Sequence, residues 1–232
     1  MKTRTLVAML AALGLLVGTS QAGVIIEHVG DNNPTDEDAR WFYAWGGPPD
    51  AQAGSLGGEA GWQLNGANGI YVESSFFTDN PGLLVKGWVL EARMAFLAAP
   101  GGNNDTALLI QDGTTGVHTF WQEPNWNTSN AVGVIQTLAE YPGVNEWGDY
   151  RIEYDPEGDG GNGDLSFYFN DTFLQTRTRG ELEANGNERI RWSHGGSNQT
   201  IWSLVRLTEI PEPASMTLLA IGGLAMFRRR RS

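Results

Sequence analysis

The chain has 232 residues, a formal net charge of −12 at pH 7 and no cysteine. The absence of cysteine excludes a disulfide-stapled domain, and an acidic surface excludes binding to nucleic acid or anionic lipid by charge attraction. The length suits one domain with a sizeable core, flanked by two terminal segments of different composition.

The N-terminal segment, residues 1–22, has the pattern of a secretory signal peptide. Lys2 and Arg4 form a basic region, and an uninterrupted apolar stretch follows. A small-x-small sequence ends at Ala22, so the exported chain is predicted to begin at Gly23. The apolar stretch is too short for a stable spanning helix, which favours an export signal over an anchor.

The region 23–80 alternates between apolar and turn-forming segments. Residues 31–38 form an acidic, turn-rich loop, and residues 46–61 are rich in Gly, Ala and Pro, which predicts a long loop. The dipeptides Asn65-Gly66 and Asn68-Gly69 are typical of hairpin turns. Short strands are expected at Val24–Val29, Arg40–Trp45, Trp62–Asn65 and Ile70–Glu73.

From Gly87 onward the apolar residues recur with period two. In Trp88–Phe96, every second residue is apolar, while Glu91 and Arg93 lie on the alternate face. This pattern predicts strands with one buried face, and no amphipathic helix is evident between Gly23 and Glu209. We therefore predict an all-β sandwich over residues 23–208. Further strands are expected at Thr106–Gln111, Gly116–Gln122, Ala131–Leu138, Asp149–Tyr154, Leu165–Phe169, Thr172–Arg177, Arg189–Trp192 and Thr200–Leu207.

Three successive segments of this region resemble one known fold. Trp147–Asp155, a Gly-rich turn, Asp164–Asp171 and a later strand ending in Trp202–Leu207 are similar in order to the concanavalin A-like or laminin G-like jelly roll. The resemblance implies that the last strand returns to pair near the first. It also implies a curved sheet whose concave face or edge loops often bind glycans, without implying that this chain does so.

No catalytic constellation stands out in the sequence. Some jelly rolls are glycoside hydrolases with a Glu-x-Asp-x-x-Glu strand, and this chain lacks that pattern. Glu73, Glu91 and Glu153 each stand alone among apolar or cationic neighbours, as solvated residues of an outer face do. No catalytic residues are therefore predicted, and a divergent glycan-active enzyme remains the alternative.

An acidic loop at residues 155–164 is the one candidate for a metal site. Asp155, Glu157, Asp159 and Asp164 offer hard oxygen ligands, and Gly160 allows a bend, as in the first half of a calcium loop. The position where such loops carry a bidentate Glu holds Ser instead, and no helix flanks the segment. A soluble hairpin turn is the competing interpretation, so calcium is the one cofactor considered and otherwise none is expected.

Tryptophan is the residue type that points to sugar binding. Exposed indole rings stack on sugar rings, because a large flat amphipathic side chain suits their apolar faces. Trp88 and Trp192 fall in strand patterns and are expected in the core. The candidates in or beside predicted loops are Trp121, Trp126, Trp41 and Trp45. Packing under a loop is the competing interpretation, and it is favoured over sugar binding.

The last segment, residues 209–232, has three parts in a fixed order. Pro211, Glu212 and Pro213 keep the backbone extended and exposed. The uncharged stretch 214–227 spans about 21 Å as a helix, short of the roughly 30 Å hydrocarbon core, so it would insert marginally. Four arginines follow and favour a cytoplasmic end, namely Arg228, Arg229, Arg230 and Arg231.

This arrangement of Pro-Glu-Pro, short apolar helix and arginine cluster resembles the PEP-CTERM sorting signal of bacterial exported proteins. The resemblance implies recognition by an exosortase-type membrane transpeptidase that cuts near residues 211–213. It implies transient anchorage in the inner membrane, followed by transfer to the cell surface or extracellular matrix. A simple tail anchor is the competing interpretation.

Removing both terminal segments makes the exported domain more acidic. Six of the 15 basic residues and none of the 27 acidic residues lie in these segments, so the domain carries −18. We expect an exported surface or matrix protein with a non-catalytic structural or adhesive role, able to bind extracellular polysaccharide and not nucleic acid. A self-associating scaffold is a further alternative.

Overall fold

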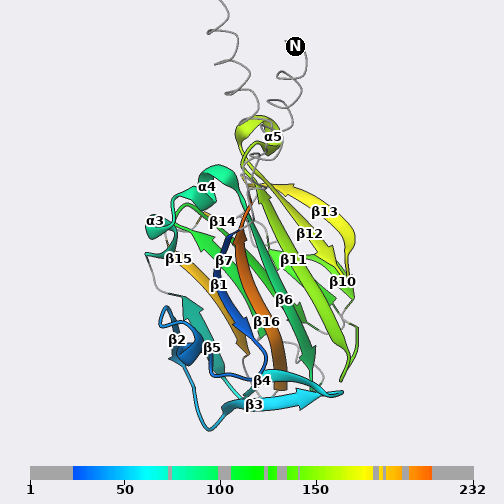
Figure 1. The fold of residues 1–232 in the computed structure, drawn as a ribbon. Helices are drawn as coiled ribbons and strands as arrows, with labels where there is room; N and C mark the ends of the chain where they lie inside the picture. The colour runs from blue at the N-terminus through cyan, green and yellow to red at the C-terminus, as the bar shows by residue number, and fades with distance from the viewer. Residues whose placement is uncertain are drawn as a thin grey trace, which may run out of the picture. The chain divides into compact units, whose positions relative to one another are not determined.

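Two β-sheets build the part of the chain that the structure describes (Figure 1). The structure is a computed structural model that describes residues 23–72, 75–98, 106–122, 125–129, 135–140, 142–179, 183–184, 187–194 and 199–210. Within it, Val24–Glu209 form one compact unit. The predicted signal peptide and the predicted sorting segment from Pro211 onward lie outside the described residues.

The first sheet, sheet A, contains the last strand of the domain near its middle. Adjacent strands along its path are antiparallel, and the first strand also pairs with the last, as the jelly-roll resemblance implied. In order across the sheet the strands are β13 (Thr172–Thr178), β12 (Asp164–Phe169), β11 (Trp147–Asp155), β6 (Trp88–Phe96), β16 (Gln199–Glu209), β4 (Glu59–Asn65) and β3 (Ala51–Leu56), with β1 (Gly23–Val29) also paired to β16.

The second sheet, sheet B, is antiparallel along its path as well. Its strands come from the segments between those of sheet A, so the chain crosses between the sheets several times. In order they are β10 (Ile135–Glu140), β9 (Asn125–Ser129), β8 (Thr115–Gln122), β7 (Thr106–Asp112), β15 (Glu188–His194), β5 (Asn68–Val72) and β2 (Trp41–Trp45), with β14 (Glu183–Ala184) paired to β8.

The predicted period-two pattern decides which face of each strand is buried. In β6, Leu90, Ala92 and Met94 are at most 2% exposed, whereas Glu91 and Arg93 point away from the core. In β11, Tyr150 and Ile152 are likewise buried. Because apolar and polar residues alternate, each of these strands has one face in the core and one in solvent. The prediction of an all-β sandwich is therefore confirmed.

Aromatic side chains from the two sheets meet in the core. The rings of Trp192 in β15 and Trp202 in β16 have centroids 5.4 Å apart, and Trp126 in β9 lies 4.9 Å from Tyr150 in β11. All four are at most 2% exposed. Because each pair joins a strand of sheet A to a strand of sheet B, burial of these rings holds the two layers together.

A buried histidine ties the first strand to this core. The His28 ring is fully buried and stacks on Trp192 at 5.0 Å. Its Nδ1 lies 2.6 Å from Glu37 Oε2 and its Nε2 lies 3.3 Å from the Trp202 carbonyl oxygen. Partial burial alone would raise the pKa of Glu37, but hydrogen bonds with His28, the Val29 N–H and Asn32 together outweigh it and lower that pKa. His28 thus serves packing between β1, β15 and β16.

The prediction of one long loop over residues 46–61 is wrong from residue 51 onward, where the chain forms β3 and the start of β4. One glycine of this segment serves packing, because a Cβ at Gly61 would lie 2.7 Å from Ile201 Cγ1. Small residues here leave room for the buried Ile201 side chain, so a composition typical of a loop occurs in a strand.

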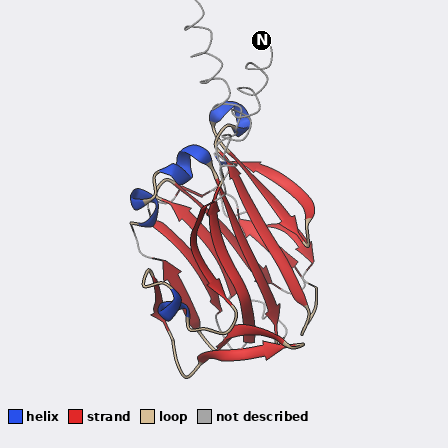
Figure 2. Cartoon of the chain, viewed as in Figure 1, coloured by secondary structure: helices blue, strands red, loops and turns tan. Residues whose placement is uncertain are grey.

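Short helical segments of four or five residues lie in the connections (Figure 2). Among the described residues none has the length of an amphipathic helix, which agrees with the lack of helical periodicity in the sequence. The acidic loop at residues 31–38 contains the first of them. They are α2 (Pro34–Glu37), α3 (Phe76–Asp79), α4 (Gly82–Lys86) and α5 (Gly158–Gly161).

Candidate functional site

Two of the four tryptophans that were candidates for sugar stacking are core residues. Trp126 is 0% exposed and Trp41 is 2% exposed. Trp126 was expected beside a loop, but it lies in β9 with its ring against Tyr150 and Phe167 of sheet A. The prediction of sugar stacking is wrong for Trp41 and Trp126, because neither ring presents a face to solvent.

The other two tryptophans lie in sheet B. Trp121 is in β8, in register with Trp126, and its side chain is outside the described part of the structure. Trp45 is the last residue of β2, opposite Gly69 of β5, and is 36% exposed. Trp45 therefore remains a candidate for sugar stacking.

The candidate calcium loop joins β11 to β12, which pair as an antiparallel hairpin. Asp155 and Asp164 lie opposite each other at the base, while Glu157 and Asp159 are exposed near α5. Among the described residues, no group of three or more His, Cys, Asp or Glu side chains is placed to hold a metal ion. The loop has the form of the competing interpretation, a soluble turn, and calcium binding by it stays a prediction without support from geometry.

The sorting residues and the cleavage position cannot be placed in this fold. Pro211, Glu212, Pro213, Ala22 and the arginines 228–231 lie outside the described residues, and Gly23 is the first residue of β1. In the described ranges, the helices are all too short and insufficiently apolar to cross a membrane. The predicted apolar helix at residues 214–227 is outside those ranges.

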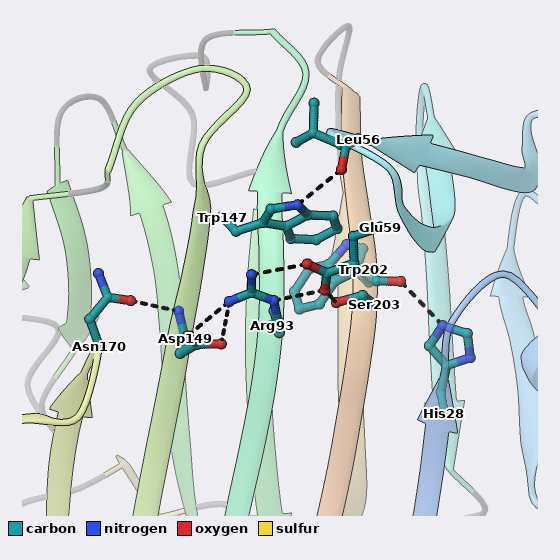
Figure 3. Close-up of polar contacts among 9 residues, drawn as sticks. All are labelled: His28, Leu56, Glu59, Arg93, Trp147, Asp149, Asn170, Trp202 and Ser203. Atoms are coloured by element: carbon teal, nitrogen blue, oxygen red, sulfur yellow. Dashed lines mark hydrogen bonds and ion pairs between the residues drawn. The ribbon is translucent and has the colours of Figure 1, made fainter.

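The outer face of sheet A carries an organised set of polar contacts centred on Arg93 (Figure 3). The Arg93 guanidinium donates to both carboxylate oxygens of Glu59, at 2.7 and 3.0 Å, and to both of Asp149, at 2.8 and 2.9 Å. Its central carbon lies 5.2 Å from the Trp147 ring centroid. Arg93 is thus held by two carboxylates and one indole, so its orientation is fixed before any ligand binds.

The tip of the β3–β4 hairpin completes this cluster. Gly57 and Gly58 have φ values of +62° and +87°, which glycine adopts without steric cost in a tight turn. The turn places Leu56 and Glu59 beside β11 and β6, where the Trp147 indole N–H donates to the Leu56 carbonyl oxygen at 3.3 Å (Figure 3). A hairpin from one edge of sheet A therefore reaches strands near its middle.

A second row of charged residues crosses the same face. Arg206 in β16 and Arg151 in β11 are both in register with Glu91 of β6. Arg206 lies 2.9 Å from Glu27 and 4.0 Å from Glu91. The Arg151 guanidinium lies 3.9 Å from the centroid of the Tyr168 ring and pairs with Glu153 at 3.2 Å. Guanidinium and carboxylate groups therefore alternate across the sheet.

A depression of about 130 Å³ lies between the two rows. It combines carboxylates, a guanidinium and a floor of strand residues, and the turn between β12 and β13 contributes Asp171. Its lining is Glu91, Ala92, Asp149, Tyr150, Arg151, Asp171 and Leu204. Because carboxylates accept and guanidinium groups donate, this surface offers both hydrogen-bonding partners that a hydroxyl group needs.

The electrostatics of the cluster favour ionised groups. Hydrogen bonds from Arg93 hold the pKa of the Glu59 carboxyl below its ordinary value, although partial burial opposes the shift. Glu59, with Asp149, in turn raises the pKa of Arg93 further above its ordinary range. Glu59 is thus charged at neutral pH, whereas a general acid needs a carboxyl whose pKa is raised.

This surface was not predicted from the sequence. Glu91 and Glu153 were expected on an outer face, and the structure shows both on that face, partly exposed. The arginine neighbours of Glu91 come from strands far from it in the sequence. The sequence does show charged residues at alternate positions of β6 and β11, which indicates one polar face on each strand. Only the order of strands in the sheet shows that these two polar faces are neighbours.

Comparison with known proteins identifies the C-terminal segment and the fold. Residues 209–231 match the PEP-CTERM protein-sorting motif, which confirms that resemblance. The motif indicates a secreted protein that is sorted via the membrane, and it implies processing by an exosortase. A comparison with curated protein sequences gives no match.

Solved structures with a similar fold include a carbohydrate esterase of the Shiga toxin-encoding bacteriophage phi24B. The two share 10% identity with a TM-score of 0.57, over 82% of this chain and 99% of the esterase. Botulinum neurotoxin type C, whose entry into cells depends on two ganglioside molecules, has 10% identity and a TM-score of 0.58 over 88% of this chain. The binding domain of Paraclostridial mosquitocidal protein 1 has 11% identity and a TM-score of 0.53 over 83% of this chain.

The chain spans about half the length of the two toxin structures, covering 52% and 50% of them. Identities this low establish the β-sandwich fold and not a shared ligand. Fold and motif agree with the organisation expected from the sequence. The protein is therefore an exported all-β sandwich that carries a PEP-CTERM protein-sorting motif at residues 209–231.

Proposed function

We propose that the protein is a non-catalytic component of the cell surface or extracellular matrix that binds polysaccharide on the outer face of sheet A. The observation that carries this proposal is the depression of about 130 Å³ lined by Glu91, Asp149, Arg151 and Asp171. Its size suits one sugar residue of a chain lying across the sheet, and its charged groups suit hydroxyls rather than apolar ligands.

The fixed orientation of the lining supports this proposal. Arg93 holds Asp149 through two contacts, and the Tyr168 ring supports the Arg151 guanidinium. Groups already held in place lose little conformational freedom on binding, which favours affinity for flexible, hydrated ligands. Tyr168 and Trp147, which contact Arg151 and Arg93, add flat side chains to the same face.

The pairing of the carboxylates supports a non-catalytic role. Asp149 is bound by Arg93, and Glu91 lies beside Arg206 and Arg151. A glycoside hydrolase needs two carboxyl groups that face the scissile bond, whereas both of these carboxylates have guanidinium neighbours. The divergent enzyme is the alternative that the experiment below distinguishes.

The test is binding of the full-length chain, in a detergent without sugar groups, to a glycan array. Asp171→Asn removes one charge from the depression, and Asn tolerates the positive φ of +60° at this position. Loss of a charge-assisted hydrogen bond should weaken binding about tenfold. Asp159→Asn is the matched control, because Asp159 also has a positive φ (+47°) and lies at the other end of β12.

Equal binding by Asp171→Asn and Asp159→Asn would show that the glycan does not bind in the depression. Release of reducing ends from a bound glycan would favour the enzyme over the binding protein. Repeating the array with and without calcium tests the hairpin that contains Asp155, Glu157, Asp159 and Asp164, which should make no difference if that hairpin is a soluble turn.

A further inference from the structure

The outer face of sheet B presents an exposed indole ring. A register shift between Tyr43 and Trp45 in β2 places Trp45 opposite Gly69 of β5. Trp45 is 36% exposed, whereas Trp41, four residues earlier in the same strand, is 2% exposed. The local irregularity therefore turns one aromatic ring of this strand towards solvent and leaves the other in the core.

Gly69 supports this ring from below. A Cβ added to Gly69 would lie 2.5, 2.6 and 2.7 Å from three consecutive ring atoms of Trp45. A point so close to three neighbouring ring atoms lies above the ring plane, so the six-membered ring rests on the Gly69 backbone. Any larger residue in this strand position would displace the ring. One ring face is thus held against β5, and the 36% of the side chain that is exposed lies away from that backbone contact.

Arg191 of β15 lies on the same side of sheet B. Its guanidinium carbon is 5.6 Å from the Trp45 ring centroid. This cation–π contact restricts both side chains and brings guanidinium N–H donors close to the indole. An apolar ring with polar donors close to it matches a pyranose ring, which has C–H groups on its face and hydroxyls around its rim.

We propose that Trp45, Gly69 and Arg191 form a second sugar-binding site, which stacks on a pyranose ring of a neutral polysaccharide. This site lies on the outer face of sheet B, opposite the depression on the outer face of sheet A. With both sites occupied, one molecule joins two polysaccharide strands, and this bridging role rests on the proposed function of sheet A. The stacking site itself does not depend on it.

A neutral polysaccharide fits this surface better than other ligands. The domain carries −18 once both terminal segments are removed, and this charge opposes the approach of a polyanion. A stable protein interface buries about 1,200 Å² or more, far beyond the exposed part of one indole. A repeating polymer gains from many such small contacts along its length.

The experiment uses the full-length chain in a detergent without sugar groups, with hydroxyethyl cellulose and dextran as neutral probes and alginate as an anionic probe. Gel mobility in the presence of each polymer measures binding, and clumping of polymer-coated beads measures bridging. Trp45→Ala should weaken binding to a neutral probe about tenfold and stop clumping. Trp45→Tyr, which keeps a flat ring, should retain most of both.

Two further variants distinguish loss of stacking on Trp45 from loss of any exposed aromatic ring. Gly69→Ala should weaken binding as Trp45→Ala does, because the added methyl group displaces the ring. Phe42→Ala removes a ring that is 41% exposed on β2 and should leave binding unchanged. Thermal unfolding of each variant identifies those that have lost the fold.

The outcomes distinguish the two sites. Loss of clumping in both Trp45→Ala and Asp171→Asn, with binding abolished only in the double variant, supports bridging. Sensitivity to Trp45→Ala alone supports the stacking site and overturns the proposed function of sheet A. Wild-type affinity in Trp45→Ala, an equal loss in Phe42→Ala, preference for alginate, or no binding of either neutral probe overturns the stacking site.

Discussion

Arg93 shows how single residues organise the outer face of sheet A. Its guanidinium contacts Glu59, Asp149 and the Trp147 ring. The Ser203 hydroxyl donates to Glu59 Oε1 at 2.6 Å, and Arg93 Nε donates to the same oxygen, so this oxygen has two donors (Figure 3). A partly exposed ion pair usually contributes little to stability, but a network of this kind orients its members for ligands.

The contribution of Glu59 to stability should depend on pH in a defined direction. Its pKa in the folded protein lies below the ordinary value of 4.5, so its stabilising effect is present above that value and is lost as the pH falls through the folded pKa. At neutral pH, Glu59→Gln should reduce the free energy of unfolding by at most about 1 kcal/mol. The difference from wild type should shrink and vanish as the pH falls from 4.5 through the lower folded pKa.

Urea unfolding of both proteins across this pH range measures the effect. Glu157→Gln, in the exposed hairpin between β11 and β12, controls for the loss of one negative charge. A difference between wild type and Glu59→Gln that stays constant with pH would contradict a role for the ionised carboxylate.

At the scale of elements, hairpins place the groups that surround the depression. The turn between β12 and β13 consists of Asn170 and Asp171, with φ values of +46° and +60°. The Asp149 N–H donates to Asn170 Oδ1 at 2.9 Å, and the Asn170 N–H donates to the Asp149 carbonyl oxygen at 2.9 Å (Figure 3). This turn therefore supplies Asp171 to the depression and also fixes the backbone of Asp149.

Asn170→Ala should destabilise the fold by about 2 kcal/mol, because alanine tolerates positive φ poorly and the side-chain hydrogen bond is lost. Asn170→Gly keeps the backbone conformation and should cost only about 1 kcal/mol. Denaturant unfolding measures both. Equal losses in the two variants would show that the backbone conformation of this turn contributes nothing.

At the scale of the whole molecule, the sandwich has two outer faces and an export motif at the end of the chain. The face of sheet A carries alternating charges, and the face of sheet B carries the supported indole of Trp45. The motif at residues 209–231 directs the protein out of the cell, where extracellular polymers are accessible. Export and surface chemistry both agree with the proposed polysaccharide ligand.

Deleting residues 211–232 should leave the protein exported but no longer retained at the cell surface, since the deletion removes the sorting motif and leaves the sandwich intact. Immunoblots of cell and medium fractions measure the distribution, with the full-length chain as the reference. Unchanged retention at the surface would contradict sorting through this segment.

Several features follow from the sequence alone because their signals are local. The order of Pro-Glu-Pro, apolar stretch and arginine cluster is read along the chain, and it identifies the sorting motif. Alternation in β6 and β11 is equally local, because successive side chains of a strand point to opposite faces. These signals were sufficient to predict an exported all-β sandwich and the residues that each of these strands buries.

The candidate sites depended on the tertiary structure. Glu91 meets Arg151 and Arg206 only because β6 lies between β11 and β16 in sheet A, and no local pattern encodes that order. Trp45 and Trp126 were both expected in or beside loops, yet a register shift exposes one and the packing of two sheets buries the other. Strand order and register arise from contacts between distant segments, and these decide which residues share a surface.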